Sequence, residues 1–123
     1  MKLQNNLYKI VNIDKEKGCF HVALQPECLI YKAHFPEQPI TPGVCIIQIA
    51  TELFELLQGK PLSLVEVVNA KFLSVINPLE KPEVDYKFSK IIWNETDVTV
   101  KVFVLVSYGD LPCAKLSLLY KVA

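Results

Sequence analysis

The chain has 123 residues, which suits one domain built around a single core. Its 13 basic and 13 acidic residues cancel at neutral pH, which argues against nucleic acid as the main partner. The hydrophobic fraction of 51% predicts heavy burial and favours an oligomeric interface, and no apolar run is long enough to span a bilayer. The polar residues 1–6 are unlike a signal peptide, so we expect a cytoplasmic protein that does not bind membranes.

The cysteines give no indication of a metal site. Four of them are scattered along the chain without any C-x-x-C pairing, at Cys19, Cys28, Cys45 and Cys113. Buried reduced thiols are the expected state of such residues, and neither a zinc site nor a disulfide framework is predicted. We expect no cofactor.

The first predicted elements are two strands, at residues 7–13 and 19–24, which are joined by a turn at 14–18. In the second of them His21 falls on the polar face and is expected at the surface. Residues 26–42 follow, and their prolines predict a loop. This loop is longer than most connections, and long ordered loops often carry function.

One helix is predicted over residues 44–57, with a stop provided by Gly59 and Pro61. Its first half is apolar nearly all round, which predicts a buried helix. Four more strands are predicted at 62–75, 83–93, 98–106 and 112–122. The count predicts an α+β fold in a single domain, 1–123, with an antiparallel sheet of about six strands wrapped around one long central helix. A lone sheet of this kind would leave an apolar face open, so a dimer is expected.

Residues 34–48 are the most informative segment. A titratable imidazole, His34, precedes three prolines, and Pro42 stands where the helix begins, a position that tolerates a missing N–H. The free backbone N–H groups that start at Gly43 form a site for partial negative charge. Gln48 occupies the helix position at which a carboxylate would be useful for acid–base chemistry.

This segment resembles the β-hydroxyacyl-(acyl-carrier-protein) dehydratases of the hotdog fold. Their pattern is Gly-His-Phe-x-Gly-x-Pro-x-x-Pro-Gly-Val, followed by a helix that carries Glu or Asp five residues after the last Gly. The matching residues are His34, Phe35, Pro36, Pro39, Pro42, Gly43 and Val44. Residues 69–78, with Lys71-Phe72 before a Pro-containing turn, resemble a downstream strand of the family. Ala33, Glu37 and Gln48 depart from the pattern.

The resemblance implies removal of water from a β-hydroxyacyl thioester, with no metal. His34 would take the α-proton, and the backbone N–H of Gly43 would stabilise the thioester oxyanion. Ile40 would orient the imidazole through its backbone carbonyl. Gln48 could hydrogen-bond the leaving hydroxyl, but an amide cannot donate a proton at useful rates, and Glu52, one turn later on the same face, is a possible alternative acid.

The remaining residues implied by the resemblance bind the substrate: Phe35, Ile40, Pro42, Val44 and Phe72. The implied partners are an acyl thioester of acyl carrier protein or coenzyme A, the carrier protein itself, and a second copy of the chain in a homodimer or a dimer-based higher oligomer. Two other functions stay open. The chain could be an impaired acyl-binding partner subunit that has lost the acid, or an acyl thioesterase, because the hotdog fold hosts several activities.

Overall fold

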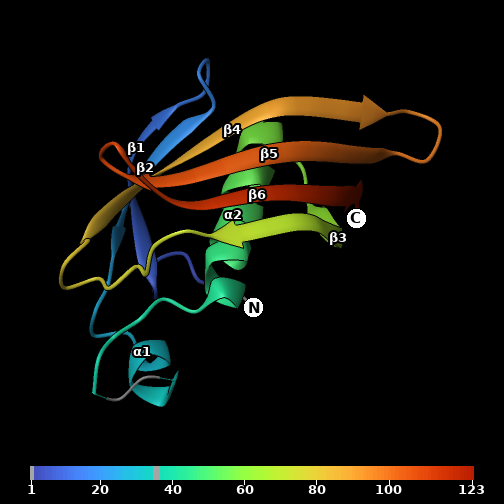
Figure 1. Ribbon diagram of the computed structural model, residues 1–123. Coiled ribbons are helices and arrows are strands. Elements are labelled where there is room, and N and C mark those ends of the chain that lie inside the picture. The colour runs from blue at the N-terminus through green and yellow to red at the C-terminus, as the bar shows by residue number, and fades with distance from the viewer. Residues whose placement is uncertain (1, 35–36) are drawn as a thin grey trace.

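The computed structural model describes residues 2–34 and 37–123, except for the side chain of His34. Within these residues the chain folds into one six-stranded antiparallel sheet with the strand order β1-β2-β4-β5-β6-β3, and α2 lies across one face of the sheet (Figure 1). The elements in chain order are β1 (Tyr8–Asp14), β2 (Cys19–Leu24), α1 (Leu29–His34), α2 (Gly43–Gln58), β3 (Leu62–Phe72), β4 (Glu83–Asn94), β5 (Thr99–Tyr108) and β6 (Leu111–Val122).

The core lies between α2 and the face of the sheet that it covers. Alternate residues of β5 point into this layer, because successive side chains of a strand face opposite sides. The helix contributes Ile49, Leu53 and Phe54, all fully or almost fully buried. The ring of Phe54 stacks on Phe88 with a centroid distance of 5.5 Å, which fixes the helix against β4.

The predicted strands are confirmed, with ends that shift by up to three residues. The helix begins one residue earlier and ends one residue later than predicted, and its 16 residues make it shorter than the long helix expected for the fold. Gly59 ends it as predicted. Its φ of 69° lies in the left-handed region, and its backbone N–H bonds to the carbonyl of Glu55.

Two expectations were wrong. The segment predicted to be loop contains a short helix, α1, because Tyr31 is buried there and its hydroxyl is tied to the chain ahead of α2. Six residues are too few to show a helical period in the sequence. The start of α2 is also less buried than expected, since Val44 is 68% exposed on the protomer.

Strand β3 forms one edge of the sheet, beside β6. From its third to its eighth residue its side chains are exposed, and they include Leu64, Val65, Val67 and Val68. An apolar edge with unpaired backbone groups is a template for pairing with another strand. No helix in the described part of the chain is long and apolar enough to cross a membrane.

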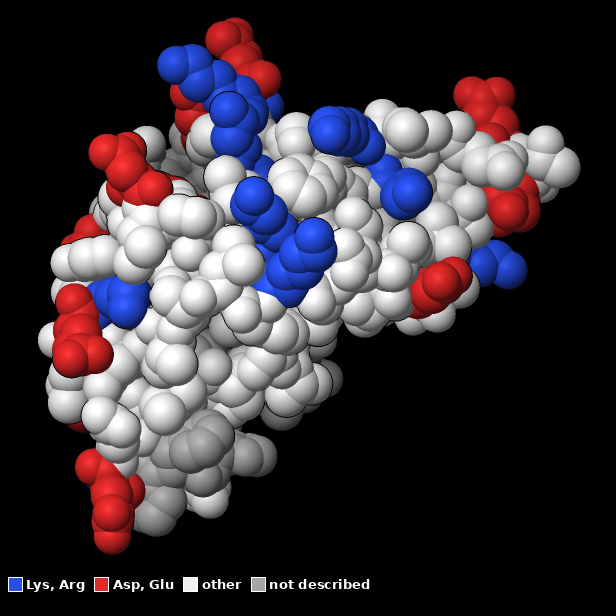
Figure 2. All heavy atoms as spheres, in the orientation of Figure 1, with Lys and Arg blue, Asp and Glu red and all other residues white. Residues whose placement is uncertain are grey.

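The face of the sheet that turns away from α2 carries lysines. Lys87, Lys115 and Lys71 fall in one row across the strands, with Leu105 between the first two. Figure 2 shows this face, with lysines over the middle of the sheet and most of the acidic residues toward its rim. These lysines are separated from the α2 side by the thickness of the sheet.

Candidate functional site

The N-terminus of α2 offers backbone donors. Pro42 precedes the helix with φ −62° and ψ 147°, and its carbonyl accepts bonds from the N–H groups of Cys45 and Ile46. The N–H groups of Gly43 and Val44 have no partner among the described residues. Orphan donors of this kind, aligned with the helix dipole, favour negative charge. The start of the helix therefore offers N–H groups to a negatively charged or polar ligand atom, and the predicted oxyanion role of Gly43 stays a prediction.

An apolar cleft opens at this helix start. It has a volume of about 410 Å³ and is lined by Ile40, Thr41, Gly43, Ile46 and residues 72–76. The ring of Phe72 lies against Gly43, so that a methyl carbon added to the glycine would come within 2.9 Å of the ring. The absence of a side chain at Gly43 thus allows the phenyl ring to cover the first turn of α2.

Helix α1 is held near this cleft by a buried hydrogen bond. The Tyr31 hydroxyl lies 3.0 Å from the Thr41 hydroxyl, two residues ahead of Gly43. Burial is the main cause that raises the pKa of Tyr31 to about 12. His34 is the last residue of α1. Its side chain lies outside the described structure, and so do Phe35 and Pro36.

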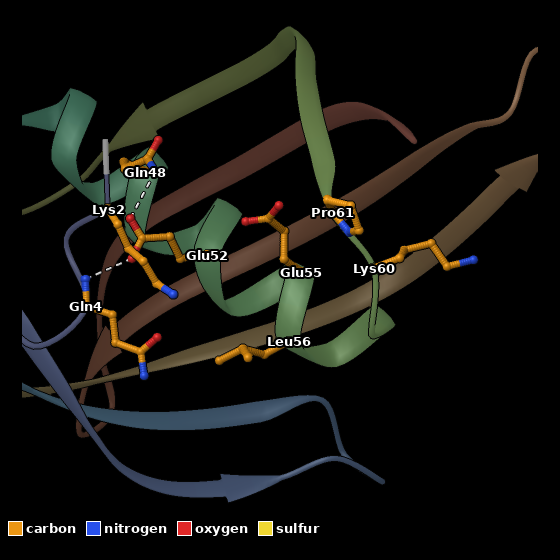
Figure 3. Close-up of a pocket in the computed structure, with 8 residues that line it drawn as sticks. All are labelled: Lys2, Gln4, Gln48, Glu52, Glu55, Leu56, Lys60 and Pro61. Atoms are coloured by element: carbon orange, nitrogen blue, oxygen red, sulfur yellow. Dashed lines mark hydrogen bonds between the residues drawn. The ribbon is translucent and has the colours of Figure 1, made fainter. Parts of the chain in front are cut away.

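A second polar centre lies farther along α2. Glu52 is only 5% exposed, and four donors converge on its two carboxylate oxygens. Figure 3 shows two of these bonds, from the Gln48 side chain and from Gln4. One oxygen accepts the backbone N–H of Leu3 at 2.7 Å and the Gln48 side-chain amide at 2.9 Å. The other accepts the backbone N–H of Gln4 at 2.9 Å and the Tyr8 hydroxyl at 3.0 Å. The predicted shared face of Gln48 and Glu52 is confirmed by their direct contact.

This carboxylate changes the electrostatics of its neighbours. Burial is the larger cause that raises the pKa of Tyr8 well above its usual range, and the charge of Glu52 and the hydrogen bond to it add to this. At neutral pH the phenol therefore keeps its proton and donates it to Glu52. The N-terminal segment, residues 3–8, is thereby attached to the middle of α2 by the Tyr8 hydroxyl and by the backbone N–H groups of Leu3 and Gln4.

A polar cavity of about 450 Å³ adjoins this centre. It is lined by Lys2, Gln4, Gln48, Glu52, Glu55, Leu56, Lys60 and Pro61. In Figure 3 Glu52 and Gln48 lie together near the N-terminal segment, and Glu55 projects one turn farther along the helix. The carboxylate of Glu55 accepts the backbone N–H of Leu62 at 2.9 Å, which closes the turn between α2 and β3.

Gly43 and Gln48 line different cavities of the protomer. Gln48 stands five positions after Gly43, which corresponds to a net rotation of about 140° around the helix axis. Gly43 and the side chain of Gln48 therefore lie on different sides of α2. Within one protomer the structure does not bring these two candidate site residues into one cavity.

The other residues predicted to bind substrate are distributed unevenly. Ile40 and Phe72 line the apolar cleft, Pro42 precedes α2, and Val44 is exposed on its first turn. Sequence reasoning missed the role of Leu3, Gln4 and Tyr8 around Glu52. The available signal was the position of Glu52 on a helix expected to be buried, because a buried carboxylate needs donors.

His21 was expected at the surface, and it is half-buried between two acids. Its ring nitrogens lie 2.6 Å from Asp85 and 2.5 Å from Glu83 on the neighbouring strand. The hydrogen bond to Asp85, and then that to Glu83, raises the pKa of His21. The described residues contain no cluster of three or more side chains suited to a metal ion, and the four cysteines are free thiols, of which Cys45 and Cys113 are buried.

Comparison with known proteins identifies relatives with one type of activity. Residues 11–104 match the family model described as "ApeI-like: ApeI dehydratase". A 3-hydroxyacyl-[acyl-carrier-protein] dehydratase, FabZ, of Fusobacterium nucleatum is 31% identical over 105 residues, which cover 78% of this chain and 73% of that protein. The FabZ of Rickettsia bellii is 32% identical over 82 residues, which cover 57% of this chain and 54% of that protein.

Solved structures share the fold at low sequence identity. The dehydratase heterocomplex ApeI:P from Xenorhabdus doucetiae has a chain that superposes with a TM-score of 0.61 at 17% identity, covering 91% of this chain and 96% of that one. The virulence protein Cj0977 from Campylobacter jejuni superposes with a TM-score of 0.69 at 13% identity, covering 100% and 80%. The hotdog fold predicted from the sequence is thus confirmed.

Proposed function

Because the chain belongs to the ApeI-like dehydratase family, we propose that it removes water from a 3-hydroxyacyl thioester to give the trans-2-enoyl thioester. The observation that carries this proposal is the start of α2, where the N–H groups of Gly43 and Val44 face no described partner and Phe72 lines an apolar cleft. A thioester carbonyl at the helix start would find donors there, and an acyl chain would find apolar walls.

The proposed reaction needs one base and one proton donor. His34 takes the C2 proton while negative charge grows on the thioester oxygen beside Gly43. The C3–O bond then breaks, C2 and C3 form the double bond, and the hydroxyl leaves as water once it has received a proton. The protonated His34 can return that proton, so the atoms balance without a carboxylic acid at position 48. The alternative is that Glu52, and not His34, donates the proton to the leaving hydroxyl.

We propose in addition that the working unit is a homodimer with composite sites. Gly43 and Gln48 lie on different sides of α2, and the apolar edge of β3 is unpaired on the protomer. Pairing of two β3 edges would bury that surface and bring the helices of the two copies to the same side of a joined sheet. Gln48 of one copy would then complete the site at the Gly43 of the other.

Spectroscopy of the enoyl thioester tests the reaction. Wild type should form or hydrate the conjugated double bond, and His34→Ala should lower kcat/KM by about 10²- to 10⁴-fold, as expected for removal of a general base. Thioesters of acyl carrier protein and of coenzyme A should be compared, because the curated relatives are named for the carrier protein. Absence of turnover by wild type across carriers and chain lengths would refute the enzymatic proposal, and release of free thiol would point to a thioesterase.

Mixing of two variants, each of which lacks one of the two residues, tests the composite site. His34→Ala and Gln48→Ala are purified separately, and their subunits are then exchanged. With composite sites each mixed dimer has one intact site, so that random exchange should restore about one quarter of the wild-type activity by the symmetry of a two-site dimer. If both residues act within one subunit, exchange restores nothing, and the dimer proposal fails while the reaction stands.

A second function is favoured by Gln48. The chain would then be an acyl-binding subunit that works beside another hotdog subunit, and a solved relative is described as a heterocomplex. Gln48→Glu separates the two proposals. A rise by orders of magnitude from near zero would indicate a subunit that has lost its acid, whereas a fast wild type with little gain would indicate an enzyme that works with the amide.

A further inference from the structure

The four contacts of Glu52 define the protonation state that suits it. Apart from Gln48, its partners are two backbone N–H groups and the Tyr8 phenol, all of them donors, and each lies between 2.7 and 3.0 Å from a carboxylate oxygen. A protonated carboxyl would have to direct its own O–H at a group that already donates. The geometry therefore fits an ionised carboxylate, which can only accept.

An accepting carboxylate determines which end of the Gln48 amide faces it. Only the nitrogen end can donate, and the amide nitrogen lies 2.9 Å from Glu52. Figure 3 shows the amide oxygen of Gln48 on the side away from Glu52. The reverse orientation would place an oxygen against an oxygen, so the carboxylate holds the amide in one of its two orientations.

We propose that Glu52 is a positioning residue that makes Gln48 a hydrogen-bond acceptor for the 3-hydroxyl group of the substrate. This inference rests on the proposed function. An amide oxygen can accept two hydrogen bonds, so a hydroxyl can be bound there whatever else the side chain contacts. The 3-hydroxyacyl thioester donates to this oxygen, whereas the enoyl product has no donor at C3. The site therefore discriminates in favour of the hydroxylated acyl group and releases the product.

Binding of two matched ligands tests the discrimination. The probes are unreactive thioether analogues of pantetheine that carry either a 3-hydroxyacyl chain or the same chain without the hydroxyl. Wild type should bind the hydroxylated analogue about fivefold more tightly, the size of one ordinary hydrogen bond. Glu52→Gln should bring the ratio close to one. An amide at position 52 can pair with either end of the Gln48 amide, so Gln48 no longer has one preferred orientation. Equal ratios in wild type and Glu52→Gln would overturn the positioning role.

Tyr8→Phe is the matched control. It removes one of the four donors from Glu52 but leaves the contact to Gln48 intact, so the ratio should stay at the wild-type value even if stability falls. A ratio near one in this variant would mean that any loss of contacts around Glu52 has the same effect, which would contradict a specific role in orienting Gln48.

A measurement on wild type alone keeps the proposal testable if Glu52→Gln does not fold. The Leu3 backbone N–H and the Gln48 amide nitrogen donate to the same oxygen of Glu52, so their protons should lie close together. A nuclear Overhauser effect between them supports the orientation, and its absence from assigned spectra overturns it. This readout does not depend on turnover, so it separates failure of the positioning role from failure of the proposed reaction.

Discussion

The two cavities along α2 are lined by different kinds of chemical group. The cleft at the helix start is lined by apolar side chains and offers backbone N–H groups as donors at Gly43 and Val44. The cavity at the middle of the helix is lined by four charged side chains and contains a carboxylate with four donors. The first can stabilise charge that appears during a reaction, whereas the second surrounds a carboxylate whose donors are already in place on the protomer.

This difference predicts different responses to substitution. A preformed donor site made of backbone is insensitive to most side-chain changes but sensitive to anything that displaces the ring above it. A carboxylate that satisfies several buried donors is sensitive to its own removal, because each donor that loses its acceptor stays desolvated. Changes at the polar cavity should thus act on stability first, and changes at the apolar cleft should act on kinetics first.

The largest effect on stability is expected from Glu52→Ala. It leaves the backbone N–H groups of Leu3 and Gln4 without their acceptor, and the free energy of unfolding should fall by more than about 3 kcal/mol. Urea denaturation followed by circular dichroism measures the change. Glu55→Ala is the control, since Glu55 accepts one partly buried backbone bond and its loss should cost about 1 kcal/mol. Equal losses would remove the contrast between these carboxylates.

Gly43→Ala should act on turnover. The added methyl group would meet the Phe72 ring at 2.9 Å, so the ring must shift and the cleft changes shape. We expect kcat/KM to fall about tenfold, or 1.4 kcal/mol, with little change in stability. The double variant Gly43→Ala/Phe72→Leu provides the control, because the smaller side chain leaves room for the methyl group. If this double variant recovers none of the loss beyond that of Phe72→Leu alone, the ring is not the cause.

Tyr31→Phe should have a moderate effect on the same region. It leaves the buried Thr41 hydroxyl without the phenol, at a cost of about 1 kcal/mol in the free energy of unfolding. Because this bond ties α1 to the chain before α2, kcat/KM should fall as well. Thermal denaturation and steady-state kinetics measure the two effects. The double variant with Thr41→Val should regain stability, and a further loss there would show that the hydrogen bond is not the source.

The smallest effect is expected outside both cavities, at His21. Its folded pKa is raised, so the stabilisation is fully present below the unfolded pKa and is lost as the pH rises through the folded value. The free energy of unfolding should therefore decrease, by less than about 1 kcal/mol, as the pH rises above about 6.5, because the cluster is partly exposed. His21→Gln should remove this dependence. A decrease of the same size in His21→Gln would assign it to other groups.

Much of the fold could be read from local patterns. Alternation in β5 and the apolar period of α2 identify a strand and a helix because each pattern matches the geometry of one element. The short helix α1 could not be found in this way, because Tyr31, the one buried side chain among residues 29–33, is held by Thr41, ten residues away.

The candidate site was predictable only in part. The sequence placed Gly43 at a helix start and put Gln48 and Glu52 on one face, and the structure confirms both statements. It gave no sign that the backbone of the N-terminal segment would donate to Glu52, because a backbone N–H has no sequence signature. Whether His34, Gly43 and Gln48 act in catalysis stays a prediction for the experiments above.

The sequence by itself determined the six strands, helix α2, the helix-start motif and the family, because these depend on residues that are close together along the chain. Only the tertiary structure decided the strand order that leaves β3 at the edge, the position of the Phe72 ring over Gly43, and the donors around Glu52. The physical reason is distance along the chain. Leu3 and Tyr8 are separated from Glu52 by 49 and 44 residues, and packing of the whole sheet against α2 brings them together.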